Sequence, residues 1–122
     1  MQLNLAGQTV SRVCFDYGLV IMTGSDSELR IETAAKIGEA GQAATEFAPD
    51  APGPVAAQLV QLLRTEISQA EVSSSGALVV IFSGGVELLV APDSDYEAWQ
   101  VVGPKERVIC MPGGELAAWR GE

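Results

Sequence analysis

Residues 67–90 read ISQAEVSSSGALVVIFSGGVELLV, and this stretch decides the fold class. Three runs of β-branched and aliphatic residues, at 67–72, 78–82 and 86–90, are separated by turns rich in serine and glycine. Short apolar runs bounded by such turns are typical of antiparallel strands. The second and third runs are almost continuously apolar, which favours the interior of a sheet, because a half-exposed strand would alternate. The stretch therefore predicts a three-stranded β-meander.

A weaker copy of this pattern lies in residues 10–31, which read VSRVCFDYGLVIMTGSDSELRI. Its expected strands are 10–15, 19–23 and 28–32, and they match the three runs above in the same order, with turns between them. Recurrence of strands and turns in one order is the signature of an internal duplication. We therefore predict an α+β, mainly β fold made of two related antiparallel β-meanders with one short helix between them.

The rest of the chain fills in this plan as a single domain, residues 1–122, with one repeat at about 5–49 and the other at about 65–119. Prolines mark residues 50–54 as a linker, and apolar residues at helical spacing predict a helix over 55–64 that packs on a sheet face. The Gly-Pro turn at 103–104 predicts a further hairpin with strands at 98–102 and 107–111. The alanine-rich stretch 34–47 is left open between helix and strand.

Charge and composition exclude several function classes. The 122 residues carry 16 acidic and 7 basic side chains, a net charge of −9, and no histidine. Catalysis and zinc binding through histidine are therefore absent, which argues against an enzyme. An acidic surface repels nucleic acid and anionic membranes but attracts basic proteins. No signal peptide or membrane span is expected, so we predict a cytoplasmic protein.

The densest group of carboxylates and aromatic residues predicts the interaction surface. It comprises Asp93, Asp95, Tyr96, Glu97 and Trp99. Tyrosine and tryptophan are enriched at binding hot spots, although tryptophan in a small β-domain is more often core. The acidic spacing resembles a calcium loop, but the glycine and glutamate that such a loop requires are missing. We expect a solvated turn here, with no metal and no cofactor.

Three other groups of residues have simpler structural explanations. Cys14 and Cys110 lie in expected strands and are interpreted as buried thiols. Glu28 and Glu87 occupy equivalent repeat positions and are interpreted as surface charges, with a facing catalytic pair as the minor alternative. The Pro-Gly-Gly-Glu run at 112–115 is interpreted as a tight turn, with an anion-binding nest as the alternative.

Several segments carry a resemblance to known sequences. These are LAGQTV (5–10), VCFDY (13–17), ELRIE (28–32), YEAW (96–99) and CMPGGELAAW (110–119). Together they resemble a family of short, uncharacterised actinobacterial proteins, from which the chain departs at 34–45. The resemblance implies a bacterial, cytoplasmic, stand-alone domain, and it carries no activity or catalytic residue.

The leading hypothesis is a non-enzymatic protein-interaction module, similar to an immunity protein or a regulator. Two points are left open: whether its protein partner is basic, and whether the chain forms a homodimer. The alternative is a small-molecule or metal-binding module with a pocket between the two meanders. No catalytic residue is expected in either case.

Overall fold

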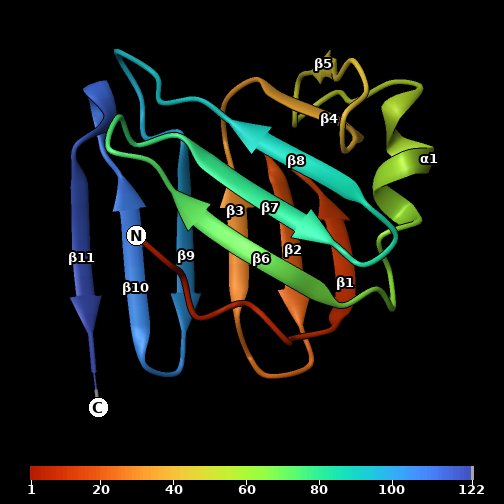
Figure 1. The fold of residues 1–122 in the computed structure, drawn as a ribbon. Coiled ribbons are helices and arrows are strands. Elements are labelled where there is room, and N and C mark those ends of the chain that lie inside the picture. Colours follow the sequence, from red (N-terminus) through yellow and green to blue (C-terminus); the bar gives the residue numbers. More distant parts are fainter. Residues whose placement is uncertain (122) are drawn as a thin grey trace.

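A computed structural model describes residues 1–121 and shows a chain whose regular structure is mostly β-strand (Figure 1). Within these residues there is one short α-helix, and a single turn of 3-10 helix covers Pro112–Gly114. The elements in chain order are β1 (Val10–Phe15), β2 (Leu19–Thr23), β3 (Glu28–Ile31), β4 (Ala35–Glu39), β5 (Thr45–Phe47), α1 (Val55–Val60), β6 (Ile67–Val72), β7 (Leu78–Phe82), β8 (Val86–Val90), β9 (Trp99–Gly103), β10 (Glu106–Cys110) and β11 (Leu116–Arg120).

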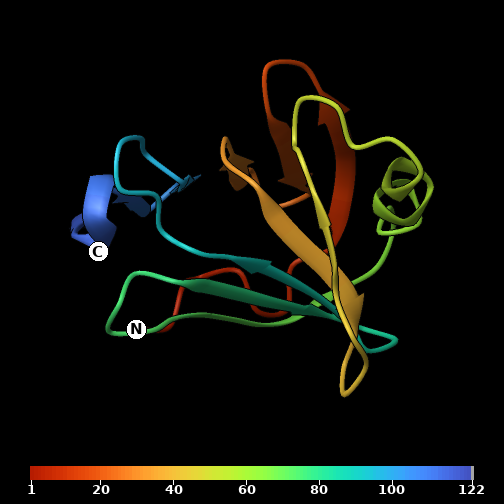
Figure 2. The ribbon, with the colours of Figure 1, turned by 90° about the horizontal axis from the view of Figure 1, so that it is seen from above.

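The strands form two antiparallel sheets that pack as two layers with their strands crossing at an angle (Figures 1 and 2). The six-stranded sheet has the order β1-β2-β3-β9-β10-β11, and the five-stranded sheet has the order β5-β4-β8-β7-β6. Both expected meanders, β1–β3 and β6–β8, are confirmed, as is the interior position of β7 and β8. The mainly β fold with a short helix between the meanders is therefore confirmed.

Each meander sends its next strand into the opposite sheet. After β3, strand β4 crosses over and pairs with β8; after β8, strand β9 crosses back and pairs with β3. This reciprocal exchange places strands of both halves of the chain in each sheet. The two halves are therefore held together by backbone hydrogen bonds as well as by the core between the layers.

The first strands of the two meanders share an irregularity. Both β1 and β6 shift register after their first residue, beside Ser11 and Ser68 respectively. The Ser11 hydroxyl donates to the carbonyl of Met22 (3.3 Å), and the Ser68 hydroxyl donates to the carbonyl of Ile81 (3.0 Å). Bulges are specific features of a fold rather than random defects. Matching bulges at matching positions are consistent with an internal duplication.

The helix is shorter than the sequence predicted. It ends at Val60 rather than at residue 64, and Arg64 adopts a left-handed φ of 70°. The reason is tertiary, because the backbone N–H of Arg64 donates to the carbonyl of Val10 (2.8 Å) and pulls the chain back toward β1. The helix lies at the side of the two layers, beside the β4–β5 hairpin, instead of covering the face of a sheet (Figure 2).

Two further segments differ from expectation. The stretch 34–47, for which the sequence favoured neither helix nor strand, forms β4 and β5. Buried Ala35 and Ile37 alternate with exposed Lys36, and β4 pairs with β8 through backbone hydrogen bonds. Pairing with a neighbouring strand overrides the helix propensity of alanine. The second is β11, which the sequence analysis did not predict; it pairs with β10 in unbroken register.

The core fills the space between the sheets and is closed at one end by the amino-terminal segment. Leu3 and Leu5 are buried in it, and the backbone N–H of Leu3 donates to the carbonyl of Ala70 (3.0 Å) beside β6. Among residues 1–121, one charged side chain is buried with these apolar residues: the Glu106 carboxylate pairs with Arg120 (2.8 Å) and accepts the backbone N–H of Asn4 (2.9 Å). The ion pair links β10 to β11, and the hydrogen bond links β10 to the amino-terminal segment.

Candidate functional site

The predicted acidic turn is ordered by Asp93. One oxygen of its carboxylate accepts the backbone N–H groups of Asp95 (2.8 Å) and Tyr96 (3.1 Å), and its carbonyl accepts the N–H of Gly113 (2.7 Å). The aspartate side chain fixes the turn from within, and the bond from Gly113 ties the turn to the segment between β10 and β11. The side chain of Tyr96 consequently stands out from the turn, with 69% of the residue exposed.

A shallow hollow of about 370 Å³ lies beside this turn and brings in a carboxylate from elsewhere in the chain. It is lined by Glu32, Asp95, Tyr96, Glu97 and Pro112. Glu32 reaches this place because its backbone N–H donates to the carbonyl of Ala98 (3.0 Å), where the end of β3 meets the start of β9. Within residues 1–121 no three carboxylate or thiol groups gather closely enough to hold a metal ion. The hollow is therefore lined by three acidic residues and one tyrosine, and these residues form no metal-binding cluster.

Trp99 does not belong to this surface. It is 1% exposed in the core, and its indole N–H donates to the carbonyl of Gly76 (3.0 Å). Inclusion of Trp99 in the interaction surface was therefore wrong, and the core interpretation of this tryptophan is confirmed. The physical reason is the alternation along β9, which turns Trp99 and Val101 inward and Gln100 outward.

The two cysteines lie on opposite faces of the six-stranded sheet. Cys110 faces the core and Cys14 pairs in register with Val20 on the outer side, so both are free thiols. Burial raises the pKa of the Cys110 thiol above its ordinary value. The interpretation of Cys110 as a buried thiol is confirmed, whereas Cys14 is only half-buried.

The minor alternatives for the remaining motifs are not supported by the geometry. Glu28 lies on the outer side of the six-stranded sheet and Glu87 on the outer side of the five-stranded sheet, so their carboxylates do not face each other. The Gly113 and Gly114 N–H groups donate to the carbonyls of Asp93 and Met111, which confirms a tight turn instead of an anion-binding nest.

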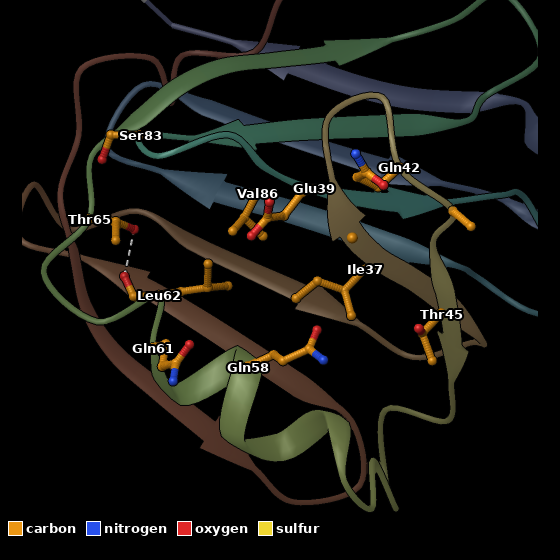
Figure 3. Close-up of a pocket in the computed structure, with 12 residues that line it drawn as sticks. Ile37, Glu39, Gln42, Thr45, Gln58, Gln61, Leu62, Thr65, Ser83 and Val86 are labelled. Carbon is orange, nitrogen blue, oxygen red and sulfur yellow. Dashed lines mark hydrogen bonds between the residues drawn. The ribbon is translucent and has the colours of Figure 1, made fainter.

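A larger cavity, which the sequence analysis missed, lies where the β4–β5 hairpin, α1 and the β7–β8 turn meet. Its volume is about 550 Å³, within the range of small-molecule sites. Figure 3 shows its polar lining, with Gln58 extending from α1 toward the hairpin. The lining residues are Ile37, Gly38, Glu39, Gln42, Ala43, Thr45, Gln58, Gln61, Leu62, Thr65, Ser83 and Val86.

The chemistry of this cavity is that of amides and hydroxyls above an apolar floor. Ile37 and Leu62 are buried at its base, and Glu39 is the charged side chain among the lining residues. The hydroxyl of Thr65 already donates to the carbonyl of Leu62 (2.6 Å), so it can only accept from a ligand (Figure 3). In the sequence, Gln58 and Gln61 stand three positions apart on the expected helix, but nothing there predicted a hairpin opposite them.

The structure is thus that of a small acidic β-protein in which each of two meanders sends its next strand into the other sheet. Over residues 1–120 the chain matches the model of DUF6188, a family of unknown function, and it belongs to that family. Comparison with curated proteins and with solved structures found no match. Within residues 1–121, no helix has the length and apolar character needed to cross a membrane.

Proposed function

We propose that this protein is a non-enzymatic interaction module that binds a basic protein segment through the hollow at Tyr96, in the manner of an immunity protein or a regulator. The observation that carries the proposal is the exposed Tyr96 ring on a turn fixed by Asp93, with the carboxylates of Glu32, Asp95 and Glu97 around it. The cytoplasmic location and the actinobacterial origin stay predictions from the sequence.

The physical argument begins with conformational order. A tyrosine held on a fixed turn loses little entropy on binding and offers a large apolar surface with a polar tip. Around it, carboxylates complement lysine or arginine, and the −9 charge of the whole chain increases the rate of encounter with a cationic partner. The absence of histidine from the sequence and the buried Cys110 thiol favour binding over catalysis.

The test compares two exposed tyrosines. Tyr17 is 95% exposed on the β1–β2 turn, outside the hollow, and serves as the matched control for Tyr96. Tagged wild type, Tyr96→Ala and Tyr17→Ala are each used to isolate bound proteins from the source cells. We expect a basic protein that wild type and Tyr17→Ala retain and Tyr96→Ala loses. Equal retention by all three, or no retained protein, would contradict the proposal.

The electrostatic component has its own measurement. The double variant Asp95→Asn with Glu97→Gln keeps the shape of the turn and removes two negative charges. Once a partner is isolated, we expect this variant to bind it more slowly, with a weaker dependence of the association rate on salt. An unchanged association rate would show that these two carboxylates do not recognise the partner.

A second candidate function follows from the 550 Å³ cavity. Its amide and hydroxyl lining, with Glu39 as its charged group, suits a small polar molecule that is neutral or cationic, and suits a metal ion poorly. Native mass spectrometry of protein from its own host tests this directly. An added mass that is lost in Gln58→Leu would support the cavity, whereas a bare chain mass would count against it.

A further inference from the structure

The edges of the two sheets differ in how well they are protected. An unpaired strand edge presents backbone N–H and C=O groups that pair readily with another chain, and proteins normally cover or distort such edges. In the part of the chain that the structure describes, the edge strands are β1 and β11 in one sheet and β5 and β6 in the other.

Three of these four edges in residues 1–121 are protected. Along β6, residues 1–8 bond to the strand, with the N–H of Ile67 donating to the carbonyl of Gln8 (2.8 Å) and that of Val72 to the carbonyl of Met1 (2.8 Å). A bulge interrupts β1, and Thr65 accepts the N–H of Val10 (2.9 Å). Strand β5 has three residues and ends at a turn. Each device is one that blocks edge-to-edge pairing.

Strand β11 has none of these protections. Its five residues, LAAWR, include no proline and no bulge, and four of the five are exposed, including Trp119 at 60%. Its charged side chain, Arg120, is already engaged by Glu106. Figure 1 shows β11 as the outermost strand, and no strand within residues 1–121 pairs with its far side.

The hydrogen-bond pattern identifies which backbone groups of β11 point outward. The N–H of Met111 donates to the backbone carbonyl of Glu115, and the N–H of Gly121 donates to the backbone carbonyl of Lys105. These two bonds show which residue pairs of the β10–β11 register are hydrogen-bonded. Because these positions alternate in antiparallel pairs, Ala117 and Trp119 bond to β10. The N–H and C=O groups of the alternate residues, Leu116, Ala118 and Arg120, therefore face away from the sheet.

We propose that β11 pairs antiparallel with β11 of a second copy of this chain, around a two-fold axis through Ala118. This register joins the outward groups of Ala118 to those of Ala118 in the other copy, and those of Leu116 to those of Arg120, giving about six backbone hydrogen bonds. On the outer face it places small Ala117 opposite Trp119 of the other copy, whose ring lies over Gly121 of its own chain. No two large aromatic side chains oppose each other in this register, and Arg120 stays paired with Glu106 of its own chain.

The size of this contact determines the strength of the dimer. Two strands of five residues bury less surface than a stable dimer usually does, so the association is concentration-dependent. Both copies carry a charge of −9, and their long-range repulsion opposes it. Added salt screens this repulsion and strengthens the dimer, the reverse of its effect on the basic partner of Tyr96.

The test uses one residue whose N–H faces outward. The substitution Ala118→Pro removes this donor without breaking a β10–β11 hydrogen bond, whereas Ala118→Ser keeps the donor and is the matched control. Sedimentation velocity is measured from micromolar to millimolar protein. We expect wild type and Ala118→Ser to shift from monomer to dimer, and Ala118→Pro to associate at least about tenfold more weakly, because both copies lose the donor. A monomeric wild type, or equal association of Ala118→Pro, would overturn the proposal.

Amide hydrogen exchange of the wild type gives a second, independent readout. Protection of the Leu116, Ala118 and Arg120 amides should rise with protein concentration, while the Ala117 and Trp119 amides stay equally protected throughout. This measurement remains decisive if Ala118→Pro does not fold. Rapid exchange of the outward amides at every concentration would refute the pairing, and Tyr96→Ala should leave it unchanged, which separates it from the proposed partner site.

Discussion

The two tryptophans of this chain allow the energetic role of the core to be measured with one substitution made twice. Trp99 is 1% exposed and donates its indole N–H to the carbonyl of Gly76 (3.0 Å), whereas Trp119 is 60% exposed on β11. Replacing each with phenylalanine keeps an aromatic ring and removes the indole donor. The structure predicts a large loss of stability at residue 99 and almost none at residue 119.

The magnitude at Trp99 has two components. Leaving the Gly76 carbonyl without its main donor costs about 1 to 2 kcal/mol, toward the lower part of the range because the Cys110 thiol also lies 3.5 Å from this oxygen. The smaller ring lacks three heavy atoms of the indole, two carbons and the nitrogen, and the space left by the two carbons costs roughly another 1.5 kcal/mol. The sum is about 3 kcal/mol for Trp99→Phe, against about 0.5 kcal/mol or less for Trp119→Phe.

The assay is urea unfolding followed by far-UV circular dichroism, since fluorescence would report on a different tryptophan in each variant. With a slope of about 1.5 kcal/mol per molar urea, Trp99→Phe should lower the midpoint by about 2 M while the slope stays unchanged. Dilute protein is used so that pairing through β11 does not contribute. The reasoning is refuted if the two variants unfold within about 0.5 kcal/mol of each other.

Three further outcomes follow from the same packing. Gly114→Ala should lower the free energy of unfolding by at least about 3 kcal/mol, because its Cβ would lie 2.1 Å from the Ser75 carbonyl oxygen at a φ of 95°. Gly84 has the same φ but open space around it, so Gly84→Ala should lower it by only about 1 kcal/mol. Thermal unfolding of both variants measures the difference. Arg120→Ala should lower the free energy of unfolding, measured by urea denaturation, by about 2 kcal/mol, because the buried Glu106 carboxylate loses its ion pair. The 40% exposure of the Arg120 side chain moderates this loss. Burial raises the pKa of the Cys110 thiol above its ordinary value of 9.0, so this thiol ionises first in the unfolded chain. The free energy of unfolding should therefore fall as pH rises above about 9, by at most about 1.4 kcal/mol per pH unit. Cys110→Ala should lack this fall when unfolding is measured from neutral to alkaline pH.

The local elements could be predicted because their signals are local. The strands β6, β7 and β8 have the bounds that their apolar runs indicated, since serine and glycine turns end each run within a few residues. The same holds for β1 and β2. Prediction failed where the signal was weak: Ala35 and Lys36 carry helix propensity, and β11 is too alanine-rich to stand out.

The candidate site was predicted only in part for a different reason. The turn formed by Asp93 and Tyr96 is a property of neighbouring residues, so the sequence located it correctly. Whether Trp99, three residues further, faces solvent or core depends on which side of β9 meets the other sheet, and that is a tertiary property. Glu32 could not be assigned to the hollow at all, because it arrives through the pairing of β3 with β9.

Alternation and turn chemistry, which act over a few residues, therefore determined that this chain folds as two meanders with a short helix between them. The tertiary structure alone decided that β4 and β9 exchange sheets, that a cavity opens between α1 and the β4–β5 hairpin, and that β11 is left as the open edge. The physical reason is that the two-residue period of a strand specifies which side chains share a face, whereas the choice of neighbouring strand depends on backbone hydrogen bonds, which every residue except proline can both donate and accept.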